Sequence, residues 1–198
     1  MKPTFLSSRP SLARIVPGVC LLLAAPLASA HTGLHASGIG GAFLHPFTGL
    51  DHVLAMLAVG AWAVVARRRG GGVPVAFVAA AIVGALAGAG GSVVPALESL
   101  LAMSVVAGGA VLCRGIRTTS PALLTAVAAA TGLVHGNAHG LEVATTAPAA
   151  SLAAFAGGTA LLHAVGYVVA RGLAAQTPRA LPLAGAVLVC TGGALAFA

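Results

Sequence analysis

The sequence predicts an all-α fold: a polytopic membrane helix bundle with six transmembrane helices after a cleaved signal peptide. Of the 198 residues, 59% are hydrophobic and only 7% are charged, and the mean hydropathy is +1.03. A soluble domain carries about 25% charged residues, so this composition indicates a chain that lives in lipid. The 27 glycines suit membrane helices, because small residues let helix backbones approach closely.

The first 30 residues have the composition of a secretory signal. Residues 1–14 are polar and basic, residues 15–28 are apolar, and Ala28-Ser29-Ala30 fits the small-x-small cleavage rule. We predict a signal peptide over residues 1–30, with cleavage after Ala30, and an uncleaved first helix is the alternative. Residues 31–198 then form one six-span transport domain.

Six apolar stretches in the mature chain approach the length of about 20 residues that a membrane span needs. They cover about 46–66, 73–94, 97–113, 120 to the loop at 145–148, 150–170 and 180–198. All seven arginines after residue 30 lie in the loops after the first, third and fifth stretches. The positive-inside rule makes those loops cytoplasmic and both mature termini periplasmic. This scattered arrangement also argues against a nucleic-acid-binding face, despite the net charge of +7.

Residues 45–52 form the first polar segment, at the start of the first predicted span. Proline suits the first turn of a helix, so we expect His45 at the mouth of the span and Asp51 and His52 about two turns inside. Adjacent helical residues diverge by about 100°, so Asp51 and His52 need not face one point. An ionised Asp in a membrane costs about 2.5–3.5 kcal/mol on insertion scales, which favours a functional role. A capping histidine and an Asp bonded to a neighbouring span are the alternative.

Residues 135–142 form the second polar segment, in the outer half of the fourth span. Spacings of four and three place His135, His139 and Glu142 on one helical face. The carboxyl end of a helix carries partial negative charge and favours a cation. A metal site is the functional interpretation, and polar contacts between packed helices are the alternative.

Three further histidines are weaker candidates. His163 lies about 13 residues into the fifth span, roughly 20 Å deep, as an inner relay or a packing residue. His31 and His35 belong to the mature N-terminal segment, where they either capture metal outside the membrane or remain solvated.

Imidazole and carboxylate without paired thiolates suit Ni, Zn, Co, Cu(II) or Fe, and argue against Cu(I) or an iron–sulfur cluster. The chain has no Gly-x-x-x-x-Gly-Lys-Ser/Thr motif, so no ATPase domain is expected. Besides a metal transporter, three alternatives remain: an intramembrane zinc-dependent hydrolase, a bis-histidine haem protein and a non-transporting membrane metal-binding accessory protein.

Two motifs resemble those of a known family. His-Pro-x-x-Gly-x-Asp-His at 45–52 and His-Gly-x-Ala-His-Gly-x-Glu at 135–142, with a signal peptide and six spans, resemble the HupE/UreJ family. Val134 departs mildly from the pattern, since the second motif often has Phe there. The resemblance implies a nickel permease of the bacterial inner membrane, with cobalt as the other candidate ion, and not an enzyme. It further implies no permanently bound cofactor, and partners among hydrogenase or urease maturation factors. Transport would depend on His45, Asp51, His52, His135, His139 and Glu142.

Overall fold

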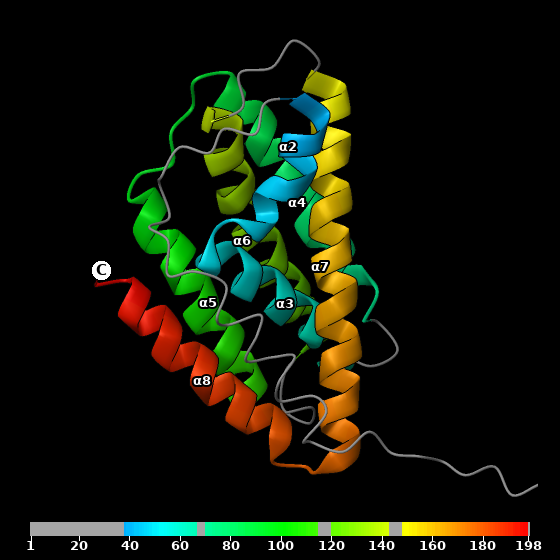
Figure 1. Cartoon of the computed structure of the whole chain (residues 1–198). Coiled ribbons are helices and arrows are strands. Elements are labelled where there is room, and N and C mark those ends of the chain that lie inside the picture. Colours follow the sequence, from blue (N-terminus) through cyan, green and yellow to red (C-terminus); the bar gives the residue numbers. More distant parts are fainter. Residues whose placement is uncertain (1–37, 67–69, 115–119, 143–147, 198) are drawn as a thin grey trace, which may run out of the picture.

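The structure, a computed structural model, describes residues 38–66, 70–114, 120–142 and 148–197, and these residues form helices and connections without a strand (Figure 1). In chain order the elements are α2 (Gly38–Leu44), the 3-10 helix η1 (His45–Phe47), α3 (Leu50–Val65), α4 (Gly72–Ala89), α5 (Leu97–Arg114), α6 (Pro121–Glu142), α7 (Pro148–Gln176) and α8 (Ala180–Leu195). The predicted signal peptide, His31 and His35 lie outside the described residues.

The all-helical prediction is confirmed, and a helix lies at each of the six predicted spans. Three of them, α4, α5 and α7, are long and apolar enough to cross a membrane, and a bent pair of α2–η1 and α3 makes up to four among the described residues. The helix α8 has only 16 residues. The helix α6 has 22, but its polar residues near the carboxyl end lower its hydropathy. The fold is therefore that of a membrane protein, while six crossings stay a prediction.

The first span was predicted as one helix from residue 46 to residue 66, and that prediction is wrong. The segments Gly38–Phe47 and Leu50–Val65 meet at an angle of 74°. Pro46 lacks a backbone N–H, and Gly49 is extended, with φ −100° and ψ 130°. The sequence also gave no sign of α2, which is too short to show a helical period. The chain thus enters the bundle through a broken helix.

The helices pack mainly in three pairs: α4 with α6, α5 with α8, and α3 with α7. Glycines let the backbones of each pair touch. A Cβ at Gly136 of α6 would collide with the carbonyl of Ala81 in α4, and one at Gly166 of α7 with the carbonyl of Leu57 in α3. Such close backbone contacts let helices associate in lipid, where the hydrophobic effect does not drive helix association.

The interior and the surface of the bundle have the character expected in lipid. Trp62 is fully buried, and its indole N–H donates to the carbonyl of Gly108 over 3.1 Å. Large apolar side chains face outward, such as Val75 (68% exposed) and Val168 (67%). Figure 1 shows α2 near one end of the bundle and α8 in the opposite half, with α7 running the whole height.

Candidate metal centre

The broken helix presents three of the predicted residues at one level. His45 opens η1, and the hydroxyl of Thr48 donates to its carbonyl over 2.8 Å. Asp51 lies in the first turn of α3 and is 8% exposed. The Nδ1 of His52 lies 2.9 Å from Oδ1 of Asp51. The two side chains therefore meet, although the angle between adjacent helical positions had left this open.

The helix α6 presents His135 and His139, one turn apart and almost completely buried (0% and 3% exposed). His135 is held from α5: its Nε2 lies 2.9 Å from the hydroxyl oxygen of Ser104, and that hydroxyl donates to the carbonyl of Leu101 over 2.6 Å. A hydroxyl has one proton to give. Ser104 must therefore accept from His135, which fixes the proton on Nε2 and leaves the lone pair on Nδ1.

The two polar segments converge. The ring of His52 lies between those of α6, with centroid separations of 4.9 Å to His135 and 4.8 Å to His139. The ring of His45 lies 4.6 Å from that of His139. We call these four histidines and Asp51 the histidine cluster. A histidine that donates Nδ1–H to a carboxylate, as the contact with Asp51 allows His52 to do, is the arrangement typical of metal ligands.

Several buried nitrogens of the cluster have no hydrogen-bond partner among the described residues: Nδ1 of His135 and both ring nitrogens of His139. A buried polar atom without a hydrogen-bond partner destabilises the folded state unless a water or an ion satisfies it. However, no three His, Cys, Asp or Glu side chains in the described chain are placed to hold one ion together. The rings pack edge to face instead, so side chains must rotate before they could share an ion. The side chain of Glu142 lies outside the described residues.

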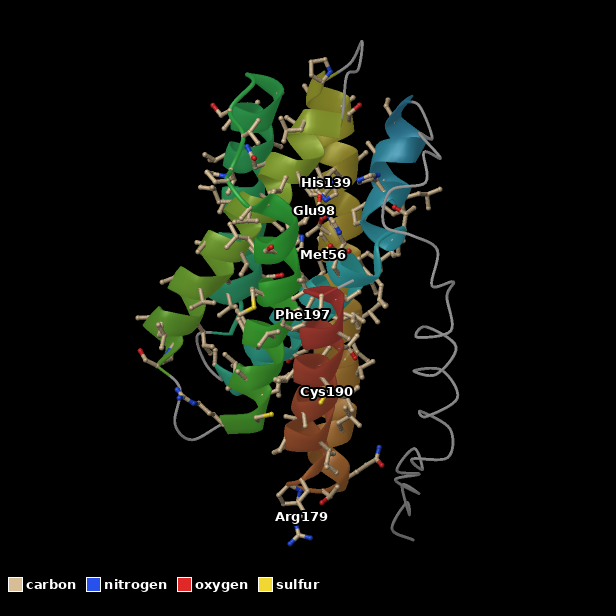
Figure 2. The ribbon with its side chains drawn as sticks, turned by 90° about the vertical axis from the view of Figure 1, so that its left-hand side faces the viewer. Met56, Glu98, His139, Arg179, Cys190 and Phe197 are labelled. Atoms are coloured by element: carbon tan, nitrogen blue, oxygen red, sulfur yellow. The ribbon has the colours of Figure 1, made fainter. Side chains whose placement is uncertain are left out.

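A cavity of about 210 Å³ leads to the cluster, lined by His45, Asp51, His52 and Glu98 together with apolar residues of α5 and α6. We call it the vestibule. Figure 2 shows Glu98 and His139 toward the same end of the bundle, with Met56 below them in that view. Sequence reasoning did not assign Glu98 to the site. Its signal was its rarity, since the chain has only three acidic residues.

Aromatic rings close the other sides of the cluster. Phe155 lies 4.3 Å from His139 between ring centroids. Phe77 lies between His135 and His163, at 5.6 Å and 5.0 Å. His163 is thus buried but separated from the cluster by a phenyl ring, so the structure does not bring it into the site.

The connection between α4 and α5 is fastened beside the cluster by Asn137. Its side-chain amide donates to the carbonyl of Ser92 over 2.7 Å and accepts from the N–H of Val94 over 3.0 Å. These bonds hold the segment that leads directly to Glu98.

The fold and this cluster define a polytopic helical membrane protein with a buried histidine site beside a broken helix. The profile of the family described as HupE / UreJ protein matches residues 19–195. Protein HupE of Rhizobium leguminosarum bv. viciae is 35% identical over 162 residues, which cover 79% of this chain and 83% of that protein. No solved structure matches. The chain belongs to the HupE/UreJ family of hydrogenase and urease accessory proteins.

Membership confirms the resemblance inferred from the two motifs. Proteins of this family are accessory or transport proteins and not enzymes. The intramembrane hydrolase is therefore excluded as a function of this chain.

Proposed function

We propose that the protein carries Ni²⁺ inward across the bacterial inner membrane, with Co²⁺ as the alternative ion, for hydrogenase or urease maturation. The observation that carries the proposal is the Nδ1 of His135. This nitrogen is buried without a hydrogen-bond partner in the described chain, and the His135 ring lies beside that of His52. Neutral imidazoles suit Ni²⁺ and Co²⁺.

Charge supports a cation in this place. Asp51 offsets the positive end of α3, and Glu98 adds an acid to the vestibule. The carboxyl end of α6 lies on the same side and favours a cation. With the arginine-bearing loops in the cytoplasm, the vestibule faces the periplasm. The ion would then exchange waters for imidazole and carboxylate there, and Glu142 is expected to complete the set.

Transport is facilitated diffusion down the gradient of the metal ion, or it is coupled to the movement of another ion, since the sequence has no nucleotide-binding motif. The site must bind weakly enough to release its ion. His163, beyond Phe77, is the predicted relay site for the ion, and an ion would reach it only when the Phe77 side chain moves aside.

Nickel uptake by cells at trace nickel tests the site. His139→Ala and Asp51→Asn should each lower uptake at least about tenfold, as loss of metal-site groups typically does, while a carboxyl-terminal reporter shows normal insertion. Thr125→Val is the matched control on α6, because within the described part of the chain the Thr125 hydroxyl bonds only to the carbonyl of Pro121 in the same helix. Normal uptake in both site variants would sink the assignment.

A non-transporting metal-binding accessory protein is the second candidate. The phenyl ring of Phe77 favours it, since this apolar side chain contacts both His135 and His163 and lies between the cluster and the inner histidine. Purified protein in vesicles separates the two functions. A transporter moves nickel to a dye inside the vesicle, whereas an accessory protein binds nickel without delivering it.

A further inference from the structure

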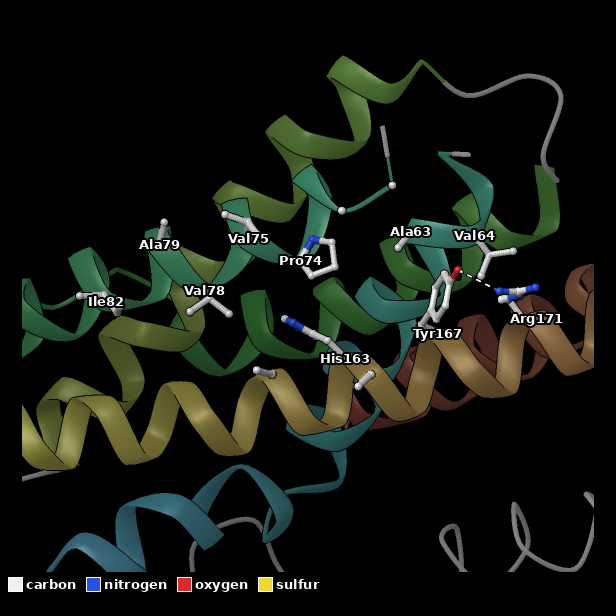
Figure 3. Close-up of a pocket in the computed structure, with 14 residues that line it drawn as sticks. Ala63, Val64, Pro74, Val75, Val78, Ala79, Ile82, His163, Tyr167 and Arg171 are labelled. Atoms are coloured by element: carbon white, nitrogen blue, oxygen red, sulfur yellow. Dashed lines mark hydrogen bonds between the residues drawn. The ribbon is translucent and has the colours of Figure 1, made fainter. Parts of the chain in front are cut away.

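A second cavity lies between α4 and α7, away from the histidine cluster. It has a volume of about 820 Å³, within the range of ligand sites. Most of its wall is apolar, with Val75, Val78 and Ile82 on α4 facing Ala160 and Ala164 on α7. We call it the α4–α7 groove (Figure 3). Its volume and apolar lining suit a hydrocarbon chain.

The polar groups of the groove gather toward one end. Tyr167 and Arg171 stand there, opposite the end marked by Ile82 (Figure 3). The Arg171 guanidinium donates to the Tyr167 hydroxyl over 3.4 Å, and its carbon lies 5.7 Å from the ring centroid. Arg171 is therefore oriented back along the helix, toward the groove.

A buried polar group is also aimed into the groove. His163 is 3% exposed, and neither ring nitrogen has a hydrogen-bond partner among the described residues. Figure 3 shows its ring pointing from α7 toward Pro74 and Val78. Arg171 follows His163 by eight residues on α7, which is about 12 Å along the helix axis. A phospholipid can span such a spacing, with its phosphate at Arg171 and an ester carbonyl that accepts from His163.

The charge of the groove selects the sign of its occupant. Among the residues that line it, Arg171 is the charged side chain, and no acid is present. A metal cation would find one imidazole and a repelling guanidinium. A molecule with an anionic head group and an apolar tail matches the groove, because the head group pairs with Arg171 and the tail packs against the apolar wall. Basic pockets between membrane helices bind anionic lipid head groups in this way.

We propose that the α4–α7 groove is a binding site for one anionic phospholipid of the leaflet at the Arg171 end. The phosphate pairs with Arg171, and one acyl chain lies along Val75, Val78 and Ile82. The site is separate from the histidine cluster and does not depend on which ion the cluster takes, but a lipid bound at His163 would exclude that histidine as a relay for the ion.

Native mass spectrometry of the full-length protein in detergent, with phosphatidylglycerol or phosphatidylcholine added, tests the proposal. Wild-type protein should keep one phosphatidylglycerol in preference to phosphatidylcholine. Arg171→Gln should reduce that retention about fivefold, as loss of one basic contact to an anionic lipid predicts. Arg179→Gln, at an exposed arginine outside the groove, should leave it unchanged.

A second pair of variants tests the tail. Ala164→Phe places a ring in the groove and should reduce retention of both lipids, whereas Ala153→Phe, on the same helix outside the groove, should not. Melting temperatures show whether each variant is folded. If Ala164→Phe does not fold, the result for Arg171→Gln alone decides whether the groove binds the lipid.

Three results would overturn the proposal: equal losses in the two arginine variants, displacement of the lipid by millimolar inorganic phosphate, or a dimer whose formation Ala164→Phe abolishes. The first means non-specific lipid contact, the second a free-phosphate site, and the third a second copy of the chain in the groove.

Discussion

The histidine cluster and the α4–α7 groove both contain buried imidazoles, but they differ in their surroundings. In the cluster, histidines from a broken helix and from α6 meet two acids, and a serine fixes the proton on His135. In the groove, His163 stands alone among apolar side chains with an arginine at the end. The number of elements that supply polar groups, more than the burial of any one histidine, separates a cation site from an apolar pocket.

The largest expected effect comes from the α4–α6 pair, which supports both regions. Gly136→Leu would drive a side chain into the backbone of Ala81. Backbone cannot yield as a side chain does, so the cost should exceed the about 1–3 kcal/mol of ordinary core overpacking. We expect little folded protein by detergent gel filtration. Gly193→Leu is the control, because no atom lies within 4 Å of a Cβ there; equal losses in both variants would contradict the packing argument.

The two kinds of histidine can be compared directly. His139→Gln should lower nickel uptake at least about tenfold, because it removes a ring that contacts both His45 and His52. His163→Gln should lower it less, since Phe77 separates His163 from the cluster. Uptake at trace nickel, normalised to inserted protein, checks the order. The reverse order would make His163 the principal site.

Asn137→Ala should act on stability before it acts on transport. It leaves the carbonyl of Ser92 and the N–H of Val94 without their bonds to the Asn137 side chain. Both bonds are only partly buried, so each should contribute about 0.5–1.5 kcal/mol to stability. We expect a lower melting temperature and faster amide hydrogen exchange at residues 92–94. Unchanged exchange there would show that Asn137 does not fasten this connection.

The smallest effect is expected at Glu98. It is exposed at the vestibule, so Glu98→Gln should weaken capture of the ion rather than its later passage. We expect a several-fold rise in the nickel concentration for half-maximal uptake, with the maximal rate nearly kept. The difference from wild type should shrink at high salt, because salt screens exposed charges. A change in maximal rate alone would place Glu98 in a later step.

Much of this architecture could be predicted from the sequence, because an apolar stretch of span length indicates a helix whatever other helices pack against it. The motifs also pointed to His45, Asp51, His52, His135 and His139, which the structure brings together, since ligand-type side chains are rare in an apolar chain. The bend was missed, because Pro46 can begin a straight helix as well as mark a break. The contacts of Ser104 and Phe77 with His135, and the place of Glu98 in the vestibule, depend on helix pairing, and no local period encodes which helices pair.

Two predictions show where local geometry has a limit. The 100° divergence left open whether Asp51 and His52 face one point, and the side chains turn toward each other at the start of α3. His163 was predicted as a relay or a packing residue from its depth, and the structure shows Phe77 between it and His135. In both cases the contacts of the side chain depend on its rotamer and on the neighbouring helices, and the position along the backbone alone does not determine them.

The pairing of α3 with α7, α4 with α6, and α5 with α8 also governs the order in which the protein assembles. Each helix of the first half finds its most extensive partner in the second half. During synthesis, α3, α4 and α5 therefore wait with these contact faces uncovered until the later helices leave the ribosome. A chain stopped after Arg114 would carry His45, Asp51 and His52 without any α6 imidazole for them to face.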